Sequence, residues 1–456
     1  MKNFLSLSLL LSFCLINAQD KPVFKALRYE DDFTYLKKDT TKTWYEQLKY
    51  TTLSEDKESY ISAGGDIRYQ YFNVKNEDWG DTPTDRDGYI LTRYLFHLDF
   101  HASKNFRFFF QLQSSLSNSR ENPSPVDENT LDIHQAFLDV TIFQKENARL
   151  LFRAGRQEML YGSQRLIAVR EFPNNRMAFD GLKLIFNSKN FKSDVFYTHP
   201  IANKMKIFDD SFNENAKLWG NYTTINNVRF LNNIDLYYLG LWKRSARFDD
   251  VSGKELRHSF GTRIFKNKGN WLYDFEGVYQ FGNLEGNDIN AWTLSSNTSY
   301  EFAKTKFSPK IGLKTELISG DKNADDGKLE TFNPLYPRGA YFGLAGLIGP
   351  SNLFDIHPSV ELKFTEDLNF GADYDIFWRL SKNDGIYAPN MMLIYSGTES
   401  KEKFIGKQLA LNLSYQPNPY LNLKVEGTWF DAGNYLKDAG TGKDVFFIAA
   451  TTQLKF

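Results

Sequence analysis

Cysteine is almost absent from this sequence. Its one cysteine, Cys14, lies inside the apolar segment at the N-terminus. The residue before it is Phe13, not the small residue that a lipoprotein cleavage site needs, so we expect no lipid anchor. Because the rest of the chain has no thiol, it has no disulfide framework, no cysteine nucleophile and no cysteine-ligated metal site.

Long apolar runs are also missing. Beyond the N-terminal segment, no stretch of about 18 uninterrupted apolar residues occurs, so we expect no transmembrane helix. The N-terminus has the parts of a secretory signal: Lys2, an apolar run over residues 4–16, and Ala18 before the expected cleavage site. We therefore predict a signal peptide at residues 1–18. Export without membrane helices leaves the periplasm, the extracellular space, or a barrel in the outer membrane.

Histidine is scarce, and motifs for catalysis are missing. Of the six histidines only His97 and His101 are close in sequence, and four residues along a strand separate them by about 13 Å, too far to share one metal. No zinc-protease signature and no nucleophile elbow occurs. The stretch from Asp321 begins like a calcium loop, but Asp326 and Phe332 occupy the positions of the required Gly and Glu. The sequence predicts no catalytic residue, no cofactor, no metal site and no nucleic-acid partner.

Aromatic residues, in contrast, are abundant, at 16% of the chain with 40 Phe and 25 Tyr. Apolar and polar residues alternate in "YILTRYLFHLDFHA" (89–102), "WLYDFEGVYQFG" (271–282) and "LNFGADYDIFWRL" (368–380). A period of two places the two kinds on opposite faces of a strand. Strands with an apolar and a polar face, rich in aromatics, are typical of outer-membrane barrels. An exported β-rich hydrolase remains an alternative.

The connections between the alternating segments indicate the strand count. Barrels of this kind have an even number of strands, with short periplasmic turns and longer extracellular loops. A weak strand at 222–231, followed by a turn at Asn232 and Asn233, brings the total to about 18, with about 16 as the alternative. We predict a transmembrane antiparallel β-barrel over 60–456, preceded by a periplasmic extension at 19–59. The links read as short are 102–105, 144–147, 187–190, 266–269, 303–306, 365–368 and 416–420, and those read as long are 117–130, 159–179, 244–256, 319–355, 381–405 and 432–444.

The last twelve residues, "VFFIAATTQLKF", alternate up to the end of the sequence. We predict that Phe446, Ile448, Leu454 and Phe456 face lipid, and that Thr451, Gln453 and Lys455 face the lumen. In a closed barrel this strand pairs with the first one. A final phenylalanine resembles the feature by which bacterial outer-membrane proteins are recognised by the barrel assembly machinery, which we expect as a partner together with outer-membrane lipid.

Five arginines lie between Phe152 and Leu184, on one strand end and the loop after it. Arginine suits a site for carboxylates, because its planar fork donates two parallel hydrogen bonds and stays charged. We predict that Arg165, Arg170 and Arg176 form the narrowest part of the pore. The alternative is that the arginines pair with Glu158, Glu171 and Asp180 or bind lipopolysaccharide. The full set predicted to line the pore and bind anions is Arg153, Arg165, Arg170, Arg176, Arg93 and Lys314.

Four stretches carry a family resemblance: "GRQEMLYGSQRL" (155–166), "NNRMAFDGLKL" (174–184), "YISAGGDIRYQYF" (60–72) and "DIHPSVEL" (355–362). They resemble the alginate export family of outer-membrane proteins. The resemblance implies an eighteen-stranded barrel with an arginine-rich lumen that passes an anionic polysaccharide or oligosaccharide. Strict alternation points Arg153 inward but Arg156 outward, unless Gly155 forms a bulge.

Alternation also places carboxylates in the lumen, and these argue against strong anion selectivity. A general porin, or a channel for another anion such as a phosphate compound, therefore remains an alternative on the same fold. The acids are Asp99, Glu276, Glu316, Asp373 and Glu426.

Overall fold

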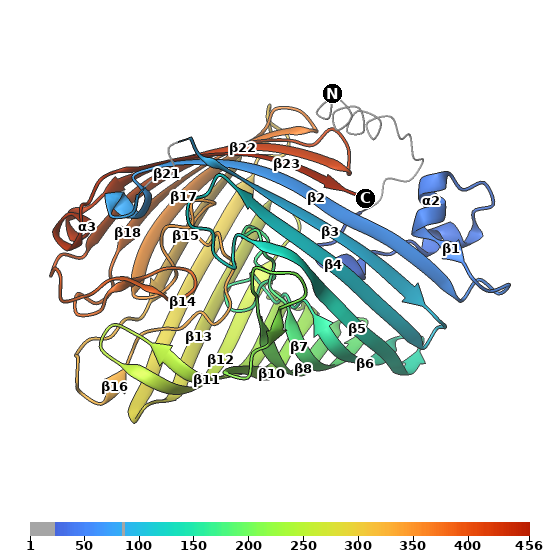
Figure 1. The fold of residues 1–456 in the computed structure, drawn as a ribbon, viewed down its shortest axis with the longest axis horizontal. Helices are drawn as coiled ribbons and strands as arrows, with labels where there is room; N and C mark the ends of the chain where they lie inside the picture. Colours follow the sequence, from blue (N-terminus) through green and yellow to red (C-terminus); the bar gives the residue numbers. More distant parts are fainter. Residues whose placement is uncertain (1–22, 84–86) are drawn as a thin grey trace.

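The computed structural model describes residues 23–83 and 87–456, and in this part of the chain 18 strands form a closed antiparallel barrel (Figure 1). The predicted fold class is confirmed, whereas the predicted signal peptide lies outside the described residues. None of the helices in the described ranges is both long and apolar enough to span a membrane.

The barrel strands are 9 to 17 residues long, and about 9 to 11 tilted residues are enough to cross a bilayer. They are β2 (Tyr60–Lys75), β3 (Tyr89–His101), β4 (Phe106–Asn118), β5 (Asn129–Lys145), β6 (Ala148–Gln157), β7 (Phe179–Ser188), β8 (Phe191–Ala202), β10 (Ala216–Val228), β11 (Asn232–Arg247), β12 (Ser252–Lys266), β13 (Trp271–Leu284), β14 (Asn287–Glu301), β15 (Lys310–Ile318), β17 (Leu353–Lys363), β18 (Leu368–Trp378), β21 (Phe404–Tyr415), β22 (Leu421–Ala432) and β23 (Val445–Lys455).

Shorter elements lie in the connections and before the barrel. They are η2 (Arg28–Glu30), η3 (Thr34–Lys38), α2 (Trp44–Lys49), β1 (Thr51–Thr52), η4 (Glu77–Gly80), β9 (Ser211–Phe212), β16 (Lys328–Leu329), β19 (Ile386–Tyr387), β20 (Leu393–Tyr395) and α3 (Asn434–Ala439). Among the strands of the described residues, β16 alone joins the main sheet in parallel, beside β14.

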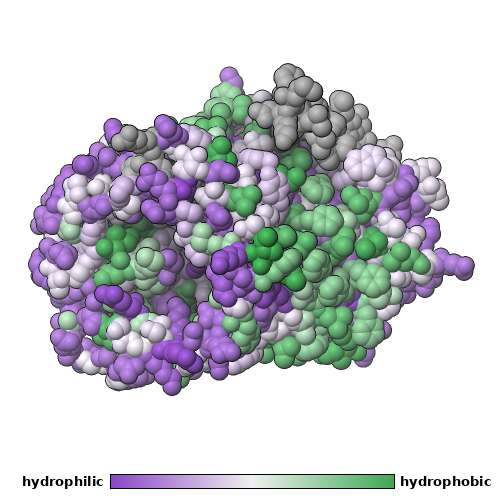
Figure 2. Space-filling model, viewed as in Figure 1, coloured by the Kyte–Doolittle hydropathy of each residue, from purple (hydrophilic) through white to green (hydrophobic). Residues whose placement is uncertain are grey.

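Alternation along each strand separates an apolar outside from a polar inside. On β3, Arg93 and His97 are buried in the lumen, whereas Tyr94 and Phe96 are exposed on the outer surface. The outer wall is consequently a broad hydrophobic surface, and the loops at one end are hydrophilic (Figure 2). This is the arrangement that a barrel needs between lipid and water.

The sheet closes where β2 pairs with β23. Residues 66–75 pair antiparallel with residues 446–455, including Ile67 with Leu454. The first and last strands are therefore neighbours, as predicted. Because closure leaves no free edge, every barrel strand has a hydrogen-bonded neighbour on both sides.

The two ends of the barrel differ, and we call them the turn end and the loop end. The segment 23–59, the C-terminal end of β23 and the connections predicted to be short lie at the turn end. The turn between β10 and β11 is at 229–231 rather than at Asn232 and Asn233. At the loop end the long connections 158–178, 319–352 and 379–403 lie close to the predicted ranges. In outer-membrane barrels the turn end faces the periplasm.

One predicted long loop is wrong. The range 244–256 contains only four residues outside strands, because β11 continues to Arg247 and β12 begins at Ser252. Polar residues at these strand ends still pair, with Lys243 opposite Glu255 and Arg247 opposite Ser252. Alternation is weak there because charged and small residues occupy most positions from 243 to 255, although Phe248 is buried in a cluster with Ala246 and Val251 packed against it.

The segment 23–59 is more than an external extension, because part of it enters the lumen at the turn end. The Tyr29 ring packs edge-on against Phe109 and Phe137, with ring centroids 6.0 and 5.2 Å away. Both phenylalanines are fully buried and point inward from β4 and β5. Tyr29 also donates a hydrogen bond to the main-chain oxygen of Glu158 at 2.9 Å.

The same segment covers the end of the barrel seam. Lys49, on α2, donates a hydrogen bond to the main-chain oxygen of Ala63 at 2.7 Å. A side chain at Gly64 would collide with this ammonium group, because a Cβ atom there would lie 2.6 Å from it. Burial, followed by the nearby Arg28 charge, lowers the pKa of Lys49 to about 7.

This cover changes the environment predicted for the last residues of the chain. Leu454 does point outward, but it is only 7% exposed because it packs in one cluster with Tyr45 of α2 and Tyr420. Phe456 is bound through its main chain to Gly65 and accepts a hydrogen bond from Arg28 at 3.0 Å. The lipid-facing assignment is therefore wrong for Leu454, whereas Phe446 and Ile448 are exposed as predicted.

The largest apolar core lies inside the barrel, where long loops fold inward from the loop end. Leu166 and Ile167 from the loop 158–178 pack with Phe332, Tyr336 and Phe342 from the loop 319–352 in one buried cluster. Main-chain hydrogen bonds join the same two loops, with Tyr336 bonded to both Leu166 and Ala168. The lumen is thus largely filled by the protein's own loops.

The orientation can be tested with two epitope tags. Residues 322–328 are exposed at the loop end, although the residues after them are buried in the lumen. We expect a tag inserted after Asp326 to bind antibody on intact cells, and a tag in the turn 416–420 to bind only after the outer membrane is permeabilised. Antibody access to both tags, or to neither, on intact cells contradicts this orientation.

The two faces of β23 give a second test. Ile448 is 56% exposed on the outer face, whereas Thr451 points into the lumen. An arginine facing lipid costs about 2 to 4 kcal/mol near the bilayer midplane, so Ile448→Arg should lower the amount of folded barrel. The matched change Thr451→Arg should be tolerated. Gel-shift assays of heat-modifiable protein measure both, and equal losses would show that the faces are reversed.

Candidate functional site in the lumen

The loop 158–178, between β6 and β7, crosses the lumen, and we call it the crossing loop. Its residues contact the barrel wall on two sides: β13 and β15 on one, and β2, β3 and β4 on the other. A loop held in this way lies across the path of a solute. The contacts at each side therefore decide how much of the lumen stays open.

Arg165 makes the first anchor. Its guanidinium lies 3.0 Å from a carboxylate oxygen of Glu276 on β13, and it also forms an ion pair with Glu316 on β15. The Tyr341 hydroxyl donates to Glu316 at 2.9 Å and so adds the loop 319–352 to the anchor. Both glutamates are buried, and a buried carboxylate needs such partners to remain charged.

Glu171 makes the second anchor, on the opposite side. Arg93 forms an ion pair with its carboxylate and donates to its main-chain oxygen at 2.9 Å. Arg68 donates to the same main-chain oxygen at 2.6 Å. Burial opposes ionisation of Glu171, but the charges of Arg176, Arg93 and Arg68 outweigh it and hold its pKa well below the usual value.

Arg176 joins this anchor to the N-terminal segment. It forms an ion pair with Glu171, lies 2.5 Å from a carboxylate oxygen of Glu158, and donates to the main-chain oxygen of Ala26 at 3.0 Å. Glu158 in turn hydrogen-bonds the His134 ring at 2.7 Å. The crossing loop and the inserted N-terminal segment are therefore parts of one network.

The predicted site residues separate into several groups. Arg93 and Arg176 meet at Glu171, and Arg165 meets Lys314 at Glu316, where the Lys314 ammonium lies 2.7 Å from a carboxylate oxygen. Arg170 contacts neither group and donates to the main-chain oxygen of Pro337 at 3.3 Å. Arg176 thus pairs with Glu158 and Glu171, as in the alternative considered from the sequence. Arg165 pairs instead with Glu276 and Glu316 of the barrel wall, which that alternative did not include.

Arg153 and Arg156 lie on opposite faces of β6, as alternation predicts. Arg153 points inward, pairs with Asp139 at 2.7 Å, and stacks over the Phe137 ring at 3.9 Å. Arg156 pairs with Asp180 at 3.0 Å, at a position where β6 and β7 stay in regular register. No bulge is therefore required at Gly155.

A cavity of about 650 Å³ opens on the loop-end side of the crossing loop. It lies between the wall, at Phe72 and Leu91, and the loop segments 172–174 and 339–347. Carboxylates of Glu77, Asp78 and Asp81 line its outer part.

A second cavity, of about 200 Å³, lies at the turn end. Six lysine and arginine side chains and two carboxylates line it. The basic residues are Lys104, Arg107, Arg149, Arg153, Lys183 and Lys192, and the acids are Glu30 and Asp139.

Five basic residues of this cavity, Lys104, Arg107, Arg149, Lys183 and Lys192, are absent from the set predicted from the sequence. Lys104 lies in the turn before β4, and the other four point inward from β4, β6, β7 and β8, with β5 between β4 and β6 in the sheet. The available signal was a cation at an inward position near the turn on four of these five strands.

Comparison with solved structures shows the fold. OccK3 (OpdO) of Pseudomonas aeruginosa superposes with a TM-score of 0.56 at 11% identity, over 87% of this chain and 95% of the other. OpdK of the same organism, solved with vanillate, gives 0.55 at 10% identity over 87% and 98%. A BenF-like porin of Pseudomonas fluorescens Pf-5 gives 0.55 at 10% identity over 87% and 99%. A search of curated proteins finds no match.

Together with the match of residues 59–446 to a family model, the closed barrel identifies this protein as an outer-membrane channel for polar solutes. Its family and fold are those of channels rather than enzymes. The sequence pattern of one family, described as alginate export, matches residues 59–446, which is most of the barrel. The chain belongs to the alginate export family.

Proposed function

We propose that the channel passes anionic saccharides, such as uronate oligosaccharides, by diffusion and without covalent chemistry. The observation that carries this proposal is the excess of cations around the turn-end cavity. Six basic side chains and two carboxylates line the cavity, and Asp99, Asp194 and Glu58 pair with Arg107, Lys183 and Lys104 from outside the lining. Among the described residues this leaves the charges of Arg149 and Lys192 without a carboxylate partner. A carboxylate-bearing solute is attracted to such a charge most strongly where low-dielectric walls surround it.

Two of these cations are available to a solute. Arg149 donates to the Thr141 hydroxyl at 2.9 Å rather than to a carboxylate, and the Lys192 side chain is exposed in the lumen. Arg153 and Lys183, in contrast, pair with Asp139 and Asp194. Arg149 and Lys192 are therefore our candidates for direct solute contact. The paired cations contribute to the electrostatic potential around them.

A smaller anion is the second candidate. OpdK was solved with vanillate, an aromatic carboxylate, and the turn-end cavity of about 200 Å³ has the size for a compact anion. A phosphate compound satisfies the same cations. The test is to compare block of the channel by uronate oligosaccharide, vanillate and inorganic phosphate.

The outer surface of the barrel indicates its expected partners in the membrane. The hydrophobic outer wall and the last strand support contact with lipid, lipopolysaccharide and the barrel assembly machinery. The segment 23–59 lies at the turn end, which supports its placement on the periplasmic side.

The charge at the turn-end cavity gives a direct electrical test. The double variant Arg149→Gln, Lys192→Gln removes two of the six cations while keeping polar groups. We expect its zero-current potential in a salt gradient to shift toward cation preference, and block by uronate oligosaccharide to weaken. Planar-bilayer recordings measure both quantities.

The matched control is Lys145→Gln, Lys189→Gln. These lysines lie beside turns at the same end but outside the turn-end cavity, so the loss of charge is equal. The control should keep the wild-type potential. Equal shifts in both double variants would show that bulk charge at the turn end, not the cavity, sets selectivity, and would refute the proposed path.

The crossing loop gives a second test. Glu171→Gln removes the charge that three arginines share, and leaving buried charges unpaired costs about 3 to 5 kcal/mol. We expect the barrel to assemble, because the loop is not part of its wall, but the loop to detach. Single-channel recordings should then show higher conductance and more current noise than in the wild type.

Asp180→Asn is the control for this variant. It breaks the pair with Arg156, an arginine–carboxylate contact at the same end that lies outside the lumen. Its conductance should equal that of the wild type. Unchanged conductance in Glu171→Gln would mean that the crossing loop does not limit flow.

A further inference from the structure

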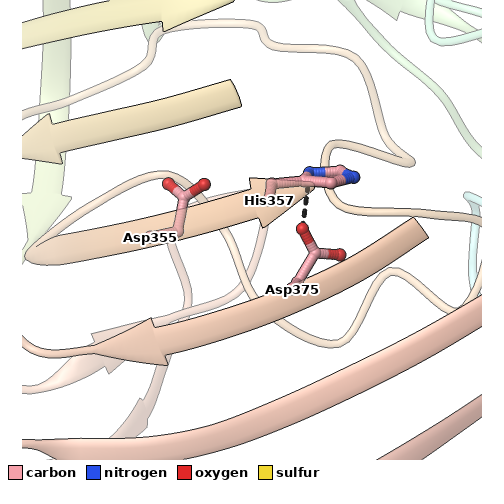
Figure 3. A group of neighbouring side chains, drawn as sticks. All are labelled: Asp355, His357 and Asp375. Atoms are coloured by element: carbon pink, nitrogen blue, oxygen red, sulfur yellow. Dashed lines mark ion pairs between the residues drawn. The ribbon is translucent and has the colours of Figure 1, made fainter. Parts of the chain in front are cut away.

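Three side chains on the lumen wall come together far from the arginine network of Glu171. Asp355 and His357 are two residues apart on β17, so both point inward, and Asp375 joins them from the neighbouring strand β18 (Figure 3). One ligand atom from each residue lies within 4.8 Å of the others. The His357 Nδ1 atom is 2.5 Å from a carboxylate oxygen of Asp375.

Asp355 forms no ion pair or hydrogen bond with the described residues, although the charges of Lys314 and Arg165 are close enough to attract its carboxylate. Its side chain is 0% exposed, and neither carboxylate oxygen has a hydrogen-bond partner among the described residues. A buried carboxylate without a partner is strongly unfavourable. In the same cluster, His357 Nδ1 and Asp375 Oδ1 also lack a partner with hydrogen-bond geometry within the described ranges.

The neighbouring cations are directed at other acids. Lys314 lies 2.7 Å from Glu316, and Arg165 pairs with Glu276 and Glu316. Neither forms an ion pair with Asp355 in the part of the chain that the structure describes. Two buried carboxylates and an imidazole nitrogen therefore face one another with no cation between them.

The atoms on the far side of the cluster are held by hydrogen bonds. The Nε2 atom of His357 hydrogen-bonds Asp373 at 3.0 Å. The side chain of Gln408 donates to Asp375 Oδ2 at 3.1 Å. Metal-binding histidines commonly use one ring nitrogen for a carboxylate and the other for the ion, and metal-binding carboxylates are hydrogen-bonded in turn.

From this arrangement we propose that Asp355, His357 and Asp375 bind a divalent transition-metal cation on the lumen wall. Imidazole together with carboxylate suits ions such as Zn²⁺, Co²⁺ or Mn²⁺, whereas Ca²⁺ and Mg²⁺ prefer ligands that are all oxygen. The ion neutralises the two carboxylates and occupies the space between their unpartnered atoms. Three protein ligands leave a coordination position for water or for an oxygen of a passing solute.

A second group of acidic side chains, Asp132, Asp209 and Asp210, lacks features that favour metal binding at the first group. It has no imidazole, and the oxygens of two of its members are already used: Asp132 accepts from the main chain of Asp210 at 2.9 Å and lies 3.7 Å from Arg156, and Asp210 accepts from Asn129 and Lys204. Within the described ranges only one buried oxygen of the group, on Asp209, lacks a hydrogen-bond partner.

The sequence did not reveal this site because its three ligands come from two different strands. Asp355 and His357 stand in the stretch "DIHPSVEL", where a spacing of two along a strand places both side chains on one face. The third ligand comes from across a hairpin, and its position depends on the register between β17 and β18. The prediction of no metal site considered only histidine pairs and the loop at Asp321, whose carboxylate accepts main-chain hydrogen bonds from Asn323 and Glu330.

The test uses the folded full-length channel in detergent, stripped with a chelator and dialysed. We expect calorimetric titration with Zn²⁺ to give one site per chain, and Co²⁺ to give the visible absorption of a cobalt ion bound to nitrogen and oxygen. His357→Gln and Asp355→Asn should abolish both signals. Asp373→Asn, which removes the positioning carboxylate, should weaken Zn²⁺ binding by about 10- to 100-fold.

His258→Gln is the matched control, since His258 lies on the outer face of β12 and bonds the Tyr238 hydroxyl. It should bind Zn²⁺ like the wild type. Absence of one-to-one binding in the wild type overturns the proposal without any variant, and so does binding that persists in folded His357→Gln. Neither result depends on which solute the channel passes.

Discussion

Closure of the sheet is the constraint on which the rest of the structure depends. Lipid offers no hydrogen bonds, so every main-chain group in the membrane must find a partner within the protein. The pairing of β2 with β23 meets this requirement for the first and last strands. The cost of closing 18 strands is a lumen too wide to be filled by wall side chains alone. The crossing loop, the loop 319–352 and Tyr29 occupy that space.

Inside the lumen, apolar packing holds the centre of the inserted loops and charged contacts hold their edges. The centre of the inserted loops is apolar, with Ile167 and Tyr336 fully or largely buried. Their edges meet a polar wall, where arginine–carboxylate contacts hold the crossing loop at Glu171 and at Arg165. Arginine is suited to such anchors, because its fork satisfies several acceptors in a fixed geometry. Two cations at the turn end, Arg149 and Lys192, have no carboxylate partner among the described residues.

The sequence predicts the wall well and the contents of the lumen poorly. Alternation and the parity of connections identify the strand count and the limits of the long loops, because lipid and water impose a period of two. The same signal fails at 244–256, where charged and small residues continue β11 and β12. Alternation places Arg93 and Glu316 inside the barrel. No local sequence pattern, however, shows that Arg93 pairs with Glu171 or that Glu316 pairs with Arg165. Those pairings depend on how the crossing loop runs through the lumen. The position of Tyr29 depends in the same way on how the segment 23–59 enters it.

The segment 23–59 contacts the seam, where β2 pairs with β23, and this has a consequence for how the barrel forms. Gln70 hydrogen-bonds Thr451 across 381 positions of the chain, and Arg28 reaches Phe456 across 428. Contacts of such high contact order form late, because a very long loop must close first. Until then β2 and β23 are open edges, ready to pair with other chains. Arg28 and Lys49 bind residues of this same seam, so separating the two edges also requires these contacts to break.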